Sequence, residues 1–179
     1  MENFMIITPE ELERSPFHLI GKEWMLITTP DSEKESGVNA MTASWGGLGV
    51  LWNTPVATIY VRPQRHTHSL LEKCDRLALC FLGDGHRKSL ALCGTKSGRD
   101  TDKVTECGLT VDKTDGVSFI SESETVMICK KLYADDLNEK SFIDREHLSH
   151  YNGDFHSFYI LEIEKILVKD KGNKNERSL

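Results

Sequence analysis

The sequence has no excess of positive charge and no long apolar run, and each absence excludes a class of protein. There are 22 Lys and Arg residues against 28 Asp and Glu residues, so the net charge of −6 argues against a nucleic-acid partner. No stretch approaches the roughly 18 apolar residues that a membrane helix needs. Residues 1–15 also lack the basic start of a signal peptide. We therefore expect a cytoplasmic protein that binds neither nucleic acid nor membrane.

Cysteine pairs with a recognisable spacing are also lacking. The count is odd and no two cysteines have the CxxC spacing, which argues against a disulfide framework and a zinc site and favours reduced thiols. A thiol or metal protein built on the cysteines and the seven histidines stays open as an alternative. The five cysteines are Cys74, Cys80, Cys93, Cys107 and Cys129.

Four common functional signatures are missing. No expected strand leads into GxGxxG or GxxxxGKS/T, so a Rossmann or P-loop protein would lack its phosphate loop. GxSxG and HExxH do not occur either, so the commonest hydrolase signatures are absent.

The length predicts a single domain, because domains typically contain about 100–200 residues and the chain has 179. We expect residues 1–168 to form it. Residues 169–179 have no apolar side chain before the last residue, which predicts a flexible tail.

Short β-branched and aromatic runs predict strands separated by short helices. Residues 155–168 fit a helix or a strand, and their composition favours the strand. Gly46-Gly47 indicates a turn or a close backbone approach. The pattern predicts an antiparallel β-barrel with helical insertions. Further strands are expected over residues 24–29, 38–45, 55–61, 76–82 and 126–133, and helices over 66–73 (with Thr67 as its cap), 86–93 and 144–151.

The segment 39–49, NAMTASWGGLG, combines small side chains with the expected end of a strand. Small residues let a flat ring lie against backbone N–H and C=O groups. Thr42 and Ser44 add hydroxyls on one face of the strand, and Trp45 adds an aromatic wall. Close packing within a barrel is the other interpretation of this segment.

Two later segments are typical of an anion site. In VRPQRHTHS (61–69), two arginines and two hydroxyls lie at an expected helix start, as a phosphate site requires. His66 and His68 fit a metal site instead, although a third ligand of matching spacing is missing. In GTKSGRDTDK (94–103), backbone N–H groups with Lys96 and Arg99 fit an anion. Residues 62–103 hold nine basic and five acidic residues, which favours a small anionic ligand.

Four segments in order carry a resemblance to a known family. NAMTASWGGLGVLW, PVATIYVRPQRHT, CGTKSGRDTDK and YNGDFHSFYILEIEKIL together resemble the flavin reductase-like proteins of the FMN-binding split-barrel superfamily, and most closely the flavoredoxin type. The resemblance covers about residues 26–168.

The resemblance implies a mainly β fold, a six-stranded antiparallel split barrel with short flanking helices. It implies a homodimer with FMN near the interface, and NADH or NADPH as electron donor. His156 would lie near the flavin or the nicotinamide, and the Ser44 hydroxyl or a backbone donor near the reactive nitrogen of the ring. Thr42, Ala43, Ser44 and Trp45 would hold the ring, Arg62, Arg65, His66 and Thr67 the ribityl chain and phosphate, and Lys96, Ser97, Gly98 and Arg99 would close over the phosphate or come from the neighbouring subunit.

The chain departs from the family at two places. His66 stands where many relatives have Tyr, and Leu161 replaces the glycine of a YIGEI segment. The implied activity is electron transfer from NAD(P)H through flavin to free flavin, a ferric chelate, a monooxygenase or an electron-transfer partner. A non-catalytic flavin or haem carrier or sensor on the same fold is the alternative.

Overall fold

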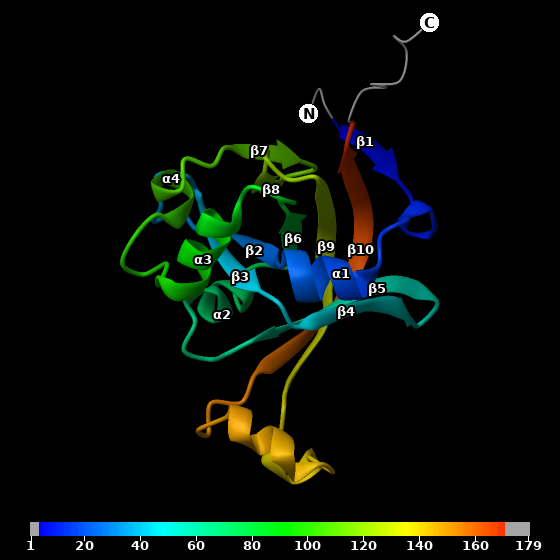
Figure 1. Ribbon diagram of the computed structural model, residues 1–179, viewed down its shortest axis with the longest axis vertical. Coiled ribbons are helices and arrows are strands. Elements are labelled where there is room, and N and C mark those ends of the chain that lie inside the picture. Colours follow the sequence, from blue (N-terminus) through cyan, green and yellow to red (C-terminus); the bar gives the residue numbers. More distant parts are fainter. Residues whose placement is uncertain (1–3, 171–179) are drawn as a thin grey trace, which may run out of the picture.

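An antiparallel sheet of eight strands forms the body of the protein (Figure 1). The computed structural model describes residues 4–170. Neighbouring strands follow the order β3-β2-β6-β9-β10-β5-β4, and β1 pairs with the C-terminal end of β10. The strands are β1 (Phe4–Ile7), β2 (Met25–Pro30), β3 (Val38–Ala43), β4 (Gly46–Leu51), β5 (Thr54–Val61), β6 (Arg76–Phe81), β9 (Thr125–Asp136) and β10 (Ser157–Lys169).

The two strands at the ends of this order, β3 and β4, are consecutive in the chain, and only Ser44 and Trp45 lie between them. So short a link makes the sheet curve round and leaves one opening between its edges. The expected mainly β, antiparallel split barrel is therefore confirmed. The expected count of six strands is not, since the part of the chain that the structure describes places eight in the main sheet. A separate hairpin contains β7 (Val111–Thr114) and β8 (Val117–Ile120).

Strand β4 begins at the glycine pair for which the sequence left two interpretations. The expected turn at Gly46-Gly47 is wrong, and the close backbone approach is confirmed. A Cβ on Gly46 would lie 2.5 Å from the carbonyl oxygen of Thr58 on β5. The true turn follows at Trp52 and Asn53, whose φ angles of 53° and 56° suit a two-residue hairpin of type I′.

Short α-helices flank the barrel, and two of them lie near their expected places. Helix α3 continues through Gly94 to Thr95. Helix α2 starts after Arg65, so Thr67 lies inside the helix and is not its cap. The α-helices are α1 (Pro16–His18), α2 (His66–Leu71), α3 (Arg87–Thr95) and α4 (Lys103–Glu106), and 3₁₀ turns cover Pro9–Glu11, Glu139–Ser141 and Arg145–His150.

The sheet buries apolar side chains on both of its faces. Ile27 and Leu79 belong to a cluster with Tyr159 and Leu161 of β10. Neighbouring residues such as Leu26 belong to a second cluster, which includes residues of α3, α4 and β8. In β10, Ile166 and Leu167 are both buried, one in each cluster, whereas Phe158 and Ile160 are half-buried. The preference for a strand over residues 155–168 is confirmed.

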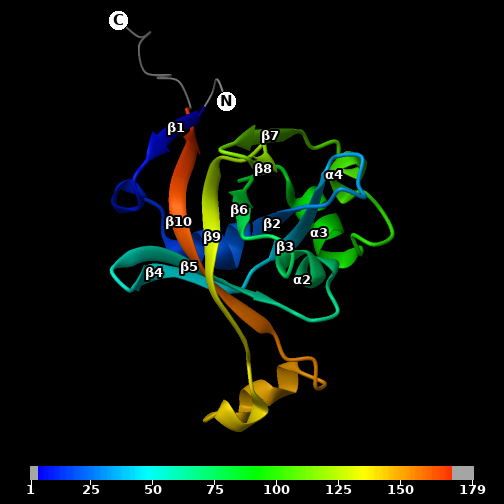
Figure 2. The same ribbon diagram turned by 180° about the vertical axis from the view of Figure 1, so that it is seen from behind.

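Strands β9 and β10 extend beyond the barrel, and residues 137–156 between them form an arm (Figures 1 and 2). Its base is closed by a hydrogen bond of 2.9 Å from the backbone N–H of Leu137 to the carbonyl oxygen of His156. It is held together by contacts among three aromatic rings, those of Phe142, Tyr151 and Phe155. The arm brings His156 to the open side of the barrel.

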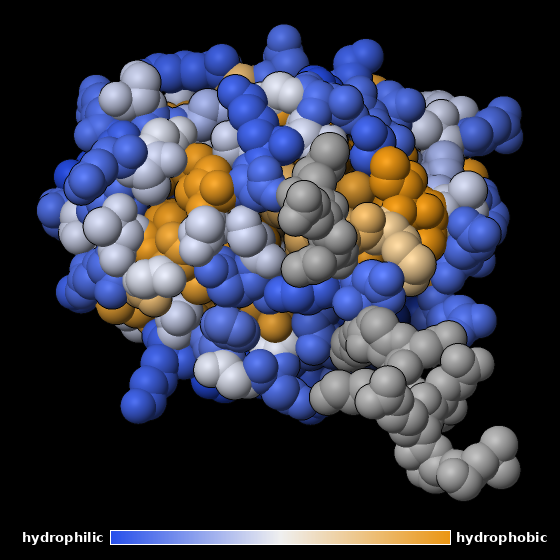
Figure 3. All heavy atoms as spheres, turned by 90° about the horizontal axis from the view of Figure 1, so that it is seen from above, coloured by the Kyte–Doolittle hydropathy of each residue, from blue (hydrophilic) through white to orange (hydrophobic). Residues whose placement is uncertain are grey.

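The end of the molecule near β1 is mainly hydrophilic, with separate apolar areas (Figure 3). Of the expected tail, Lys169 belongs to strand β10, and residues 171–179 lie outside the described residues. Within residues 4–170, no helix has both the length and the apolar character to cross a membrane.

Substituting Gly46 tests the close approach of β4 and β5. In Gly46→Ala the new methyl group would overlap the Thr58 carbonyl, and we expect a loss of about 1–3 kcal/mol in the free energy of unfolding. Gly49→Ala on the same strand is the matched control, because no atom lies within 4 Å of its Cβ position. Urea denaturation measures both variants. Equal stability of the two would contradict the account of β4.

Candidate functional site

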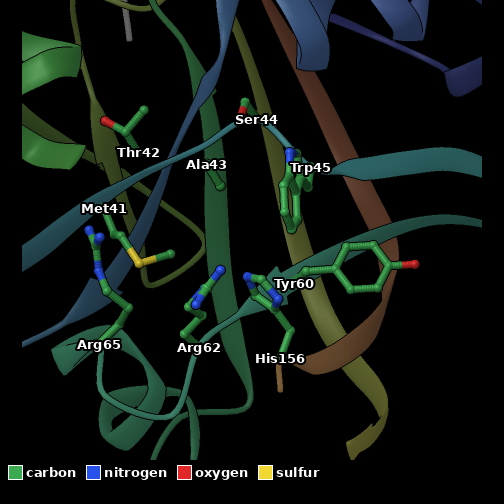
Figure 4. Close-up of a pocket in the computed structure, with 9 residues that line it drawn as sticks. All are labelled: Met41, Thr42, Ala43, Ser44, Trp45, Tyr60, Arg62, Arg65 and His156. Atoms are coloured by element: carbon green, nitrogen blue, oxygen red, sulfur yellow. The ribbon is translucent and has the colours of Figure 1, made fainter. Parts of the chain in front are cut away.

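A cavity of about 230 Å³ occupies the opening between the two edges of the barrel (Figure 4). Its walls come from the end of β3, the link to β4, the end of β5 and the base of the arm. The lining residues are Met41, Thr42, Ala43, Ser44, Trp45, Tyr60, Arg62, Arg65 and His156.

Side chains alternate along the wall that β3 provides. Ala43 and Trp45 point toward Arg62 and His156, whereas Ser44 points to the other side of the strand (Figure 4). The Thr42 hydroxyl also faces away and donates a hydrogen bond of 2.6 Å to the carbonyl oxygen of Leu90 on α3. The wall therefore offers a small apolar side chain, an indole ring and an edge-strand backbone. The hydroxyls of Thr42 and Ser44 do share one face, as expected, but it is not the face toward the cavity.

A smaller cavity of about 90 Å³ lies beside the first, and Arg65 lines both. One wall comes from the start of α2 and the other from the loop after α3. The two basic segments of the sequence, far apart in the chain, thus meet here as expected. The lining residues are Gln64, Arg65, His66, Thr67, Thr95, Lys96, Ser97, Gly98 and Lys103.

Gly98 is the position where this loop comes closest to the barrel. A Cβ there would lie 2.2 Å from Oδ1 of Asn39 and 3.0 Å from the His66 ring. Asn39 is buried, and its amide nitrogen donates a hydrogen bond of 2.9 Å to the Thr67 hydroxyl. Asn39 therefore sets the distance between loop and barrel. It stands first in the segment 39–49, but nothing in its local spacing indicated this role.

Cations gather at the C-terminal end of α3, where backbone carbonyls lack helical partners. Arg65 donates to the carbonyl oxygens of Gly94 at 2.8 Å and Cys93 at 3.3 Å. Lys103, which sequence reasoning did not assign to the site, is 4% exposed and donates to the carbonyl oxygens of Cys93 and Lys96. Burial lowers the pKa of Lys103 to about 8. The small cavity is therefore positively charged, and its cations are already held in place.

Comparison with known proteins shows the family of the chain. The model of the family named flavin reductase like domain matches residues 17–177. The chain belongs to this family. Among curated proteins, none matches the sequence.

Solved structures show the same fold as this flavin reductase-like chain. An FMN-binding protein from Thermus thermophilus has a TM-score of 0.64 and 19% identity, over 93% of this chain and 78% of that one. Flavoredoxin of Desulfovibrio vulgaris has a TM-score of 0.66 and 16% identity, over 92% of this chain and 78% of that one. The styrene monooxygenase flavin reductase from Pseudomonas putida has a TM-score of 0.59 and 14% identity, over 80% of this chain and 77% of that one.

Two of the expected phosphate ligands lie outside the small cavity. Arg62 lines the larger one, where it pairs with the Asp154 carboxylate and donates to the carbonyl oxygen of His150 at 2.8 Å. Hydrogen bonds from the Asn152 backbone, Gln64 and Arg62 hold the pKa of Asp154 well below its usual range. Arg99 donates to the carbonyl oxygen of Gln64 at 2.9 Å, beside the small cavity. In this arrangement Arg62 ties the barrel to the arm.

His66 and His68 turn to different partners. The His66 ring lies 2.9 Å from the carboxylate of Asp31, and the His68 ring lies 2.9 Å from the hydroxyl of Ser157. Over the described range, no three His, Cys, Asp or Glu side chains cluster as metal ligands would. Among residues 4–170, His66 and His68 therefore face separate partners and not a common third ligand. At the position where the resemblance implied a tyrosine, this flavin reductase-like chain pairs a partly buried His66 with the buried Asp31.

His156 lies at the base of the arm and faces the larger cavity. Its ring centroid is 5.2 Å from that of Trp45, and Nδ1 is 3.1 Å from the Tyr151 hydroxyl. Burial, with a smaller contribution from the positive charge of Arg62, lowers the pKa of His156 to about 4. The imidazole is therefore neutral at pH 7.

A pH series on His156 tests this burial. The unfolded chain binds the proton with a pKa near 6.5 and the folded chain with one near 4, so stability is lost as the pH falls below the unfolded value. We expect the free energy of unfolding to fall by about 2 kcal/mol between pH 7 and pH 5 from this group. The variant His156→Gln has no imidazole at this position, so its free energy of unfolding should not show this contribution to the fall. Urea titrations at both pH values compare the two proteins, and an equal loss in both would contradict the burial of a neutral imidazole.

Proposed function

We propose that this chain binds FMN across both cavities and passes electrons from NADH or NADPH through it to an acceptor in the cytoplasm. The observation that carries the proposal is the position of Arg65, which lines both the wide, partly apolar opening and the small basic cavity. Those two environments, side by side, match a flat ring with a phosphate at the end of a short chain. The family to which the chain belongs supports the same ligand.

The residues present fit the two ends of the cofactor. Ala43 and Trp45 offer apolar contact to a ring, and the backbone of residues 42–45, including Thr42 and Ser44, offers hydrogen bonds to its edge. Lys96, Ser97 and Gly98, with Arg65, fit the phosphate, because each hydrogen bond to a charged group contributes about 1.5–3 kcal/mol. Arg62 fits the ring or ribityl part, and His66, Thr67 and Arg99 support the phosphate side.

The chain's own work in the reaction is binding and positioning. FMN, when bound, supplies the hydride and electron chemistry. Trp45 and Ala43 would keep water from one face of the ring, and the cations of the small cavity would neutralise the phosphate. His156, neutral and close to Trp45, would contact the ring or the incoming nicotinamide without exchanging a proton. The Ser44 backbone is a better candidate than its hydroxyl for a contact at the reacting nitrogen.

A second copy of the chain is the proposed partner nearest to the site. Large apolar side chains are exposed around β4: Phe17 at 89%, Trp45 at 45%, Val50 at 75% and Trp52 at 59%. Covering these side chains would remove apolar surface from water and shield Trp45 beside the flavin. A homodimer with FMN near its interface would do both.

The acceptor divides the proposal into two forms. A flavin reductase would hand electrons to free flavin, a ferric chelate or a monooxygenase. A neighbour in fold is described as the flavin reductase of a styrene monooxygenase. A non-catalytic electron carrier, which is the alternative form, would take them from another protein.

The first test is the visible spectrum of the protein loaded with FMN, before and after anaerobic NADH or NADPH. We expect a flavin spectrum that bleaches with at least one of the two nucleotides. FMN at the same concentration without the protein is the control. A bound flavin that bleaches with neither nucleotide would contradict the reductase form and favour the carrier. A protein that fails to bind FMN would contradict both forms.

Arg65→Ala tests the phosphate contact separately from the fold. We expect FMN affinity to fall at least about tenfold, while affinity for riboflavin, which has the same ring without the phosphate, changes little. Titrations followed by flavin fluorescence measure both, with Arg145→Ala on the exposed arm as the matched control. Equal weakening of both ligands would mean that Arg65 acts only by holding α3. Unchanged FMN affinity would remove it from the site.

A further inference from the structure

Two cysteines flank the loop that forms one wall of the small cavity. Cys93 lies on α3, and Cys107 follows directly after α4. The intervening residues 94–106 include Lys96, Ser97 and Gly98. The contacts of Arg65 and Lys103 described above both end on the carbonyl oxygen of Cys93. Any bond between the two sulfur atoms would therefore tie together the ends of this loop.

Cys107 lies against the turn of α3 that precedes Cys93. The Cys107 sulfur lies 3.9 Å from the carbonyl oxygen of Ser89, which is one helical turn before Cys93 on the same face of α3. The two thiols also interact electrostatically. Both side chains pack in the cluster between the sheet and the helices. A disulfide has an S–S distance of about 2 Å, so the two side chains must turn toward each other for the bond to form.

The two cysteines differ in the way that a reacting and a resolving thiol differ. Cys107 is partly exposed and Cys93 is buried, so a small oxidant reaches Cys107 first. The ammonium group of Lys103 interacts electrostatically with both sulfur atoms. Burial raises the pKa of Cys93 to about 12, which suits this thiol to the second step and not to the first. The remaining partly exposed cysteine, Cys74, packs against the cluster inside the barrel, away from this pair.

We propose that Cys93 and Cys107 form a reversible, peroxide-sensitive dithiol that closes the cavity loop as a disulfide. Hydrogen peroxide oxidises the Cys107 thiol to a sulfenic acid and is itself reduced to water. The Cys93 sulfur then attacks the Cys107 sulfur, the S–S bond forms, and the hydroxyl leaves as a second water. A dithiol reductant reverses the change by thiol–disulfide exchange: the reductant becomes a disulfide and both protein thiols are restored. Together the steps remove two hydrogen atoms from the protein.

The disulfide adds a constraint to the site that the fold alone does not supply. It would fix the 94–106 segment at both ends and hold the carbonyl of Cys93 on which Arg65 and Lys103 depend. The source of the peroxide rests on the proposed function, since a reduced flavin that loses its electrons to dioxygen produces it. The pairing of the cysteines does not rest on that function.

The test treats the full-length protein with hydrogen peroxide, blocks the remaining thiols by alkylation, and maps the peptides without reduction. We expect one cross-linked species that joins the peptides of Cys93 and Cys107, lighter by two hydrogen atoms and restored by dithiothreitol. Because peroxide is added and the result is a mass, the outcome is independent of flavin binding. A failure here would leave the proposed function standing.

Two variants make the assignment specific. Cys107→Ser should abolish the cross-link, and Cys74→Ser, which removes the other partly exposed thiol, should retain it in full. Cross-linking of Cys107 to any other cysteine would overturn the proposal. Oxidation of Cys107 to sulfinic acid while Cys93 stays a free thiol would also overturn it. The same holds if both thiols can still be alkylated after peroxide treatment.

Discussion

The link of two residues between β3 and β4 is the constraint on which the rest of the structure depends. Ser44 and Trp45 join the two edges of one sheet, so the barrel cannot close there with hydrogen bonds or open into a flat sheet. The opening exposes an edge-strand backbone next to small side chains. Gly46 lets β4 lie close against β5, which holds the second edge in place. The larger cavity is a direct result of this geometry.

The C-terminal end of α3 sets the position of the smaller cavity. Its terminal carbonyls carry the negative end of the helix dipole, and they hold Arg65 from one side and Lys103 from the other. An arginine at the start of α2 and a lysine at the start of α4 are thereby brought to one place. Gly98 and Asn39 then bring the loop down onto the barrel. Charge and shape at this cavity therefore come from the same few contacts.

Local patterns predicted those parts of the molecule that local chemistry determines. The β-branched runs gave β2, β5, β6 and β10, and the basic segments 61–69 and 94–103 do meet. The hairpin of β7 and β8 was missed although Asp115-Gly116 is a strong signal for a type I′ turn. Long-range pairing decided the rest: Arg62 is drawn to Asp154 on the arm, and His66 to Asp31. No spacing in the sequence could indicate partners that distant.

The most direct measurement of the central claim is a crystal structure of the protein with FMN. The account predicts the ring in the opening between β3 and β4, against Ala43 and Trp45, and the phosphate in the small cavity beside Lys96, Ser97 and Gly98. A flavin bound elsewhere on the surface, with the opening between the two edge strands vacant, would contradict the account. A ring in the opening with its phosphate directed away from the small cavity would contradict the role given to the end of α3.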